Sequence, residues 1–137
     1  MTEAVVVGGY TVADKDLGLL LEAGYLYVEL CKFKEAEEVF VGLSALVPDS
    51  EVPHMALGHL YFSQGRFNPA LRAHQKALEL NPSSAAAHVS VGETLLVLRR
   101  HGEGIAELDK ALALDTDGSV SRFAKALKEA HGLGIFG

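Results

Sequence analysis

The chain has 137 residues, of which 49% are hydrophobic and 22% are charged. This length suits one domain with its own core, and the composition argues against a disordered chain and against a membrane-spanning one. Twelve Lys and Arg residues against 18 Asp and Glu give a net charge of −6, the wrong sign for a protein that binds nucleic acid. The one cysteine, Cys31, cannot form an intramolecular disulfide, which fits a reducing compartment.

Residues 1–16 form a leader to which the sequence assigns no regular element. The chain opens with an acidic residue, Glu3, and a Gly8-Gly9 pair interrupts its apolar run, so the leader lacks the features of a targeting signal. We therefore expect a cytoplasmic protein. Residues 5–7 and Tyr10 are more apolar than a free tail, which suggests that the leader docks on the array or pairs two copies.

Residues 17–118 repeat with a period of 34 residues. Pro48 and Pro82 lie 34 positions apart, and Thr116 stands at the next step. The repeats therefore span residues 17–50, 51–84 and 85–118, and each contains two amphipathic helices. Short turns are expected to join the helices of each pair at residues 30–32, 64–66 and 100–102.

Three glycines share one column of this frame, at Gly24, Gly58 and Gly92. A glycine inside a helix costs about 0.5–1 kcal/mol relative to alanine, so three in register indicate that close packing requires the space. The glycines should let the second helix of each repeat approach the first, with residues such as Phe40 filling the gap beside them. A large residue at Gly58 should disrupt the stack.

The middle repeat carries the fullest set of motif residues: Leu57, Gly58, Tyr61, Gly65, Phe67, Ala70, Ala77, Leu78, Leu80 and Pro82. This pattern resembles the tetratricopeptide repeat, and the resemblance covers residues 17–118. It implies an all-α fold, a right-handed superhelix of three helix-turn-helix repeats. The sequence departs from the family pattern where His74 replaces an aromatic residue, Gly104 replaces alanine and Thr116 replaces proline.

A seventh helix is expected after the third repeat, over residues 119–131. Val120, Phe123, Ala124 and Leu127 recur at helical spacing there, which is typical of a helix that caps a solenoid. Residues 132–137 are rich in glycine and are expected to form a flexible tail.

The family resemblance also implies a concave groove lined by the second, fifth, ninth and twelfth positions of each repeat. Most of these positions are apolar or aromatic, which predicts a hydrophobic or amphipathic segment as the ligand. Packing between neighbouring first helices is the alternative explanation for any single member. The predicted groove residues are Leu21, Tyr25, Val28, Val52, Met55, His59, Phe62, Val89, Glu93 and Leu96.

Two other functions are disfavoured by the same positions and by the absence of motifs. Tetratricopeptide co-chaperones clamp a carboxylate with basic side chains, whereas the corresponding residues here are uncharged: Leu21, Tyr25, Ala56, Ala86 and Ser90. No enzyme motif is present and the six histidines lack metal-ligand spacing, so we expect no catalysis, no cofactor and no metal. His54 and His88 share a column where a packing role is expected.

The first repeat carries a more specific resemblance, to one group of tetratricopeptide proteins. Phe40, Leu43, Leu46 and Pro48 form a cadence that resembles bacterial type III secretion chaperones, those of translocators or of the needle subunit. That resemblance implies a cytoplasmic chaperone that shields a hydrophobic export substrate in its groove, with a small co-chaperone or a second copy as a further partner. The near-consensus middle repeat is more typical of other tetratricopeptide proteins, so a generic adaptor that assembles a protein complex remains the alternative.

Overall fold

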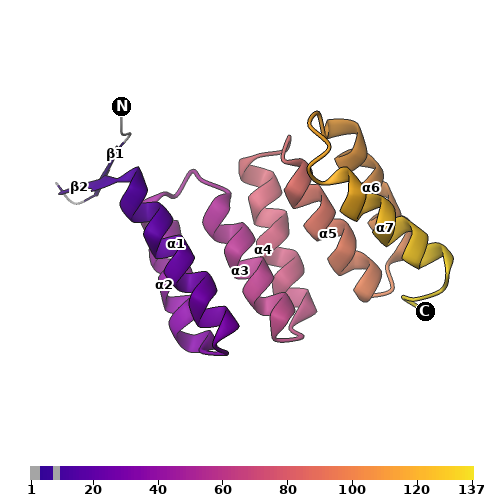
Figure 1. Ribbon diagram of the computed structural model, residues 1–137, viewed down its shortest axis with the longest axis horizontal. Helices are drawn as coiled ribbons and strands as arrows, with labels where there is room; N and C mark the ends of the chain where they lie inside the picture. Colours follow the sequence, from indigo (N-terminus) through magenta and orange to yellow (C-terminus); the bar gives the residue numbers. More distant parts are fainter. Residues whose placement is uncertain (1–3, 8–9) are drawn as a thin grey trace.

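The computed structural model describes residues 4–7 and 10–137. Seven helices in these ranges lie side by side in chain order and form an elongated array (Figure 1). None of them is both long and apolar enough to span a bilayer. The helices are α1 Asp14–Glu29, α2 Phe33–Leu46, α3 Val52–Ser63, α4 Phe67–Leu80, α5 Ala85–Val97, α6 His101–Leu114 and α7 Ser121–Gly132.

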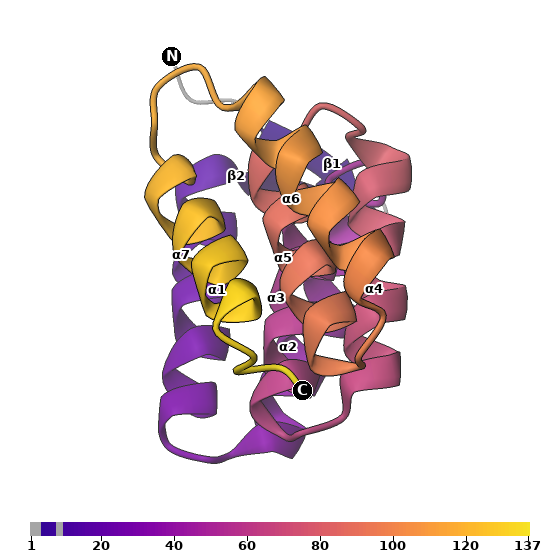
Figure 2. The same ribbon diagram turned by 90° about the vertical axis from the view of Figure 1, so that its right-hand side faces the viewer.

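The helices pair as α1 with α2, α3 with α4 and α5 with α6, and α7 packs on the last pair. Figure 2 shows the array from its C-terminal end, with α6 and α7 toward the viewer. The all-α repeat fold with a C-terminal capping helix is thereby confirmed. Stacking the pairs buries three apolar clusters in succession along the array.

Glycines at the interface within each pair have the packing role that their register predicts. A Cβ atom on Gly24 would overlap the ring of Phe40, and one on Gly58 would overlap the ring of His74. In the third pair, Gly92 lies in the same way against Leu108. The close approach of the two helices is therefore confirmed at this column in all three repeats.

The turns inside the three helix pairs have one common geometry. Cys31, Gly65 and Arg99 occupy the same column and all adopt positive φ, at 58°, 74° and 63°. In each turn the next backbone N–H donates to a carbonyl five residues earlier, at 2.8 to 2.9 Å. The third turn therefore lies at residues 98–100, and its predicted position at residues 100–102 is wrong because α6 already begins at His101.

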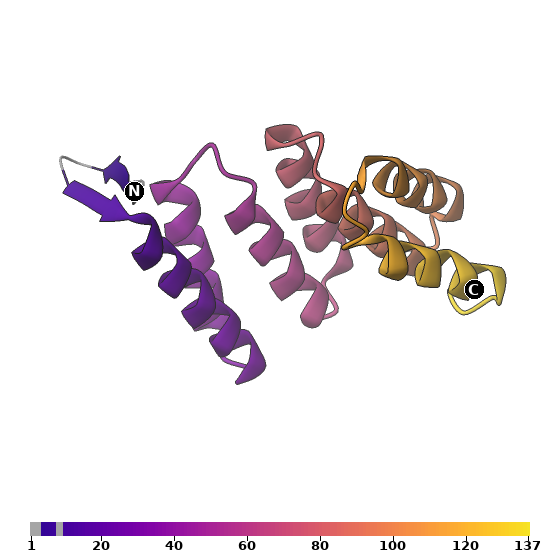
Figure 3. The same ribbon diagram turned by 45° about the horizontal axis from the view of Figure 1, so that its top comes forward.

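The N-terminal segment forms a β-hairpin that the sequence did not reveal. Strands β1 (Ala4–Val7) and β2 (Tyr10–Ala13) pair antiparallel, with Ala4 opposite Ala13 and Val7 opposite Tyr10. Helix α1 then begins at Asp14, three residues before the predicted repeat boundary. The hairpin projects from the N-terminal end of the array (Figure 3).

The C-terminal helix is held in place at its start and along its inner side. The carboxylate of Asp115 accepts hydrogen bonds from the backbone N–H of Ser121 at 2.8 Å and from its hydroxyl at 2.6 Å. Ala124 and Leu127 are buried in a cluster with residues of α5 and α6. The tail expected to be flexible continues α7 as turns and places Phe136 against that cluster.

Candidate peptide-binding groove

The candidate groove face comprises the predicted groove residues of α1, α3 and α5, and its centre is a contact between adjacent repeats. The hydroxyl of Tyr25 and Nδ1 of His59 lie 2.9 Å apart, although the residues are 34 positions apart in sequence. Tyr25 also packs edge-on against Phe40, and His59 packs against His74. The first helices of repeats 1 and 2 thus bring their ninth-position side chains together.

Apolar side chains flank this pair on α1 and α3. Leu21 and Val28 are half-buried and pack against the first core cluster. On α3, Val52 is 44% exposed and Met55 is half-buried. Phe62, also half-buried, lies edge-on to Phe67 with ring centroids 5.1 Å apart. These residues combine packing with an accessible apolar surface.

Two predicted groove residues of the third repeat are buried and cannot contact a ligand. Val89 is 4% exposed and Leu96 is fully buried. Both belong to the cluster that includes Leu108 of α6 and Leu127 of α7. Because the capping helix packs against α5 and α6, it removes this pair from the groove, which leaves Glu93 as the accessible predicted member on α5.

Burial shifts the pKa of each of these titratable groups in the direction of its uncharged form. Desolvation lowers the pKa of His59, and burial lowers the pKa of His74 to about 3, with a smaller contribution from the neighbouring His59. Burial raises the pKa of Tyr25 and that of Glu93. A neutral His59 can accept a hydrogen bond at Nδ1 from the Tyr25 hydroxyl while its own proton occupies Nε2.

Sequence reasoning missed two residues that extend the site. His74 is 1% exposed and forms the floor beneath His59, and its Nδ1 has no hydrogen-bond partner among the described residues. Phe123 of α7 continues the row of Leu21, Met55 and Val89 by one further step of 34, and it is 46% exposed. Extending the period into the capping helix would have identified Phe123.

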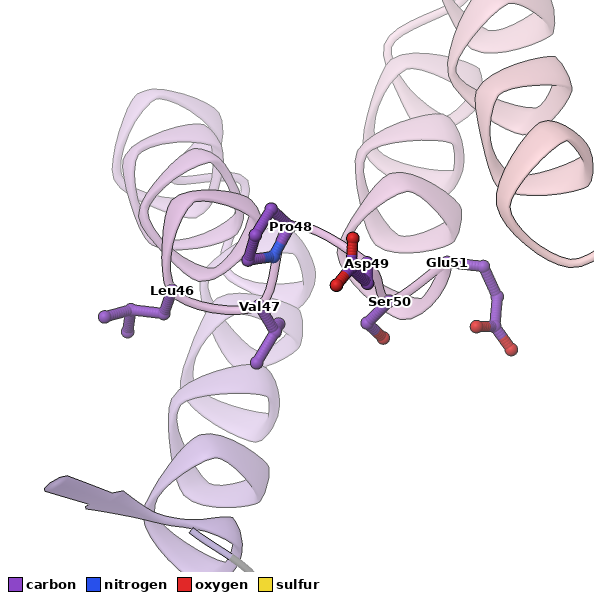
Figure 4. A pocket seen from close by; sticks show the side chains of 6 residues that line it. All are labelled: Leu46, Val47, Pro48, Asp49, Ser50 and Glu51. Atoms are coloured by element: carbon purple, nitrogen blue, oxygen red, sulfur yellow. The ribbon is translucent and has the colours of Figure 1, made fainter. Parts of the chain in front are cut away.

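A separate hollow of about 480 Å³ lies at the connection between α2 and α3. Figure 4 shows its lining residues, which follow one another from Leu46 to Glu51 along this loop. None of these lining residues is a predicted groove residue, so the hollow is a feature of the inter-repeat connection.

The repeated geometry agrees with a match at the level of sequence. The family model of the tetratricopeptide repeat matches residues 55–119, which cover most of the second repeat and all of the third. Residues 55–119 are therefore similar in sequence to the tetratricopeptide repeat, and the first helix pair shares its fold. No curated protein is similar enough in sequence to count as a relative. Tetratricopeptide repeats are protein-interaction modules.

Several solved structures share the fold of this chain. The type III secretion chaperone SycD of Yersinia enterocolitica, in complex with a peptide of the translocator YopD, is 18% identical, with a TM-score of 0.76 over 89% of this chain and 96% of that one. PcrH in complex with the chaperone binding region of PopB is 18% identical, with a TM-score of 0.74 over 85% and 97%. The first tetratricopeptide domain of Spaghetti, bound to the HSP90 peptide SRMEEVD, is 20% identical, with a TM-score of 0.72 over 88% and 97%.

Proposed function

We propose that this protein binds an apolar helix or extended segment of a protein client on its candidate groove face, and that it shields the segment as type III secretion chaperones do. The observation that carries the proposal is the accessible apolar surface around the Tyr25 and His59 pair, whose own ionisable groups favour the neutral state. An apolar side chain entering such a surface displaces water without stranding a charge.

The arrangement of the face indicates where the client would bind. Val52, Met55 and Phe62 lie on α3 beside Tyr25 and His59, whereas the capping helix covers Val89 and Leu96. The first two repeats therefore supply most of the contacts, and Phe62 is the best candidate for an aromatic anchor. Truncating such an anchor is expected to cost about 2 kcal/mol of binding free energy or more.

Two of the similar structures support a chaperone for export substrates. SycD and PcrH are described in complex with translocator segments. The Spaghetti domain instead holds a peptide that ends in acidic residues. This chain has no basic residue at Leu21, Tyr25 or the other clamp positions, so an acidic C-terminus is a poor ligand for it.

Affinity capture from the native cell extract tests the proposal with a matched pair of variants. Val52→Asp combined with Phe62→Asp places charge on the candidate groove face, whereas Val41→Asp places charge on an exposed side of α2 that is also polar in repeats 2 and 3, at Gln75 and Asp109. The wild type and Val41→Asp should retain one small hydrophobic export substrate, which the double variant loses. Circular dichroism checks that all three keep their helical content.

Capture of the same partners by all three proteins would contradict the proposal and favour an adaptor that binds through other faces. The labelled peptide SRMEEVD provides an independent test by fluorescence anisotropy. We expect no saturable binding because the clamp charges are missing. Micromolar binding of that peptide would show that an acidic ligand is accommodated after all.

A further inference from the structure

Leucines are exposed on the outer side of α1, at positions that are buried between helices in the other two repeats. Leu19 is 61% exposed and Leu26 is 54% exposed. One and two periods later, the column of Leu26 holds Leu60 and Thr94, both with no exposed surface. Leu30 is 57% exposed, so it extends the same stripe by one helical turn.

The equivalent sides of α3 and α5 pack against a neighbouring helix, which indicates the kind of surface that the leucine stripe of α1 would contact. Leu57 and Leu60 of α3 pack in one cluster with Phe40 of α2. Val91 of α5 packs in the same way with Leu71 of α4. Each first helix therefore uses this side to bind a helix of the preceding unit, and no helix of the described residues covers it on α1. A terminal repeat normally carries polar residues on such a face.

The opposite end of the array also presents an uncovered helix side. Figure 1 places α1 and α7 at the two ends. On α7, the inner side holds Ala124 and Leu127, while Phe123 is 46% exposed. Leu133, directly after the end of α7, is 74% exposed. Both ends of one molecule thus expose apolar side chains.

The charges on the two ends are opposite in sign. Helix α1 has four acidic residues and one basic residue, and its Glu22 and Glu29 are exposed. Helix α7 has three basic residues and one acidic residue, although the chain as a whole is acidic. Arg122 and Lys125 are exposed and form no ion pair within the described part of the chain.

We propose that the leucine stripe of α1 binds the exposed side of α7 of a second copy of this protein, in a head-to-tail contact. Glu22 and Glu29 of one copy then face Arg122 and Lys125 of the next. Pairing two α1 helices instead would bring four like charges beside the same leucines, which opposes association. A head-to-tail contact uses different surfaces on its two sides and builds rings or chains.

Sedimentation velocity over a range of concentrations gives the first test. The wild type should form species larger than a dimer as concentration rises, and raising the salt should weaken this association at least tenfold because the rim charges attract each other. A protein that stays monomeric throughout would overturn the proposal. Association that strengthens with salt would also overturn it, since this indicates like charges across the contact.

Blocking one end at a time gives a decisive second test. Leu26→Asp blocks α1, and Arg122→Glu with Lys125→Glu blocks α7; all three positions are exposed, so the fold should tolerate the changes. Each variant alone should be monomeric. A mixture of the two should form a one-to-one dimer, because each variant retains the end that the other lacks.

The control for surface charge is Val41→Asp, which lies on neither end and should associate like the wild type. Equal loss of association in this control would overturn the assignment to α1. If the α7 variant still dimerises by itself and the mixture gains nothing, the contact is a symmetric pairing of α1 helices, and the head-to-tail contact is excluded.

Discussion

Gly58 of α3 lies directly against the imidazole of His74 of α4, so closely that no side chain fits between the two helices. The same relationship holds between Gly24 and Phe40 one repeat earlier. His74 therefore stands in the position of a core aromatic residue, 1% exposed and packed beneath His59 of the candidate groove face. His74 thus contributes both to the stability of the fold and to the support of the groove face.

Substituting Gly58 by alanine should destabilise the fold although alanine is the better helix former. The new methyl group overlaps the His74 ring, and overpacking of this kind costs about 1–3 kcal/mol. Gly42→Ala is the matched control, since Gly42 also lies inside a helix but has open space around its Cα. That control should gain about 0.5–1 kcal/mol. Urea unfolding measures both, and a stabilised Gly58→Ala would contradict the packing argument.

His74 should make stability depend on pH in the acidic range. Its pKa in the folded protein is about 3, whereas an unfolded histidine titrates near 6.5. Between these values the unfolded chain binds more protons, so the free energy of unfolding falls as the pH is lowered, by up to about 1.4 kcal/mol per unit from this group. Above about pH 7 the contribution is constant.

The variant His74→Phe separates this effect from general acid denaturation. It installs the residue that the first repeat has at Phe40, and it removes the ionisable group. Thermal melts between pH 4 and pH 7 should show a shallower decline of Tm for His74→Phe than for the wild type. Parallel curves would show that other groups, such as His59, dominate the acid response.

Cys31 adopts a left-handed backbone conformation with φ of 58° in the turn between α1 and α2. A residue with a side chain is disfavoured there, and the second repeat has Gly65 in the same position. Cys31→Gly should therefore raise the free energy of unfolding by about 0.5–1 kcal/mol, after allowing for the greater freedom of glycine in the unfolded chain. Cys31→Ala removes the same thiol but keeps the strain, so any gain in that variant would point to another cause.

Leu96 and Phe62 occupy equivalent positions in successive repeats but should respond differently to truncation. Leu96→Ala leaves a cavity among α5, α6 and α7 and should cost about 2–5 kcal/mol of stability. Phe62→Ala removes a half-buried ring, so it should lose less stability and more client affinity. Chemical unfolding and a capture assay on both variants check this contrast. Equal effects on stability would show that α7 does not close the third repeat.

The sequence predicts most of the helices because characteristic residues recur at a fixed spacing in each repeat. The period of 34 residues aligns the glycine column, and the apolar stripes locate the helix pairs. The sequence does not locate the third turn, because Arg99 occupies the position that Gly65 marks in the second repeat, and an arginine does not signal positive φ. The hairpin is hard to predict because each of its strands has only four residues.

Sequence by itself determined the repeat, the contact column of Gly24, Gly58 and Gly92, and the lack of charge at the positions of the carboxylate clamp, since all of these follow from residues at fixed spacing. Only the tertiary structure decided which groove residues are accessible. Val89 and Leu96 occupy the same repeat positions as Leu21 and Phe62. Helix α7 packs against Val89 and Leu96, and they are buried, whereas Leu21 and Phe62 stay half-buried. Burial depends on which helix is the neighbour, and that neighbour is set by the stacking of the whole array.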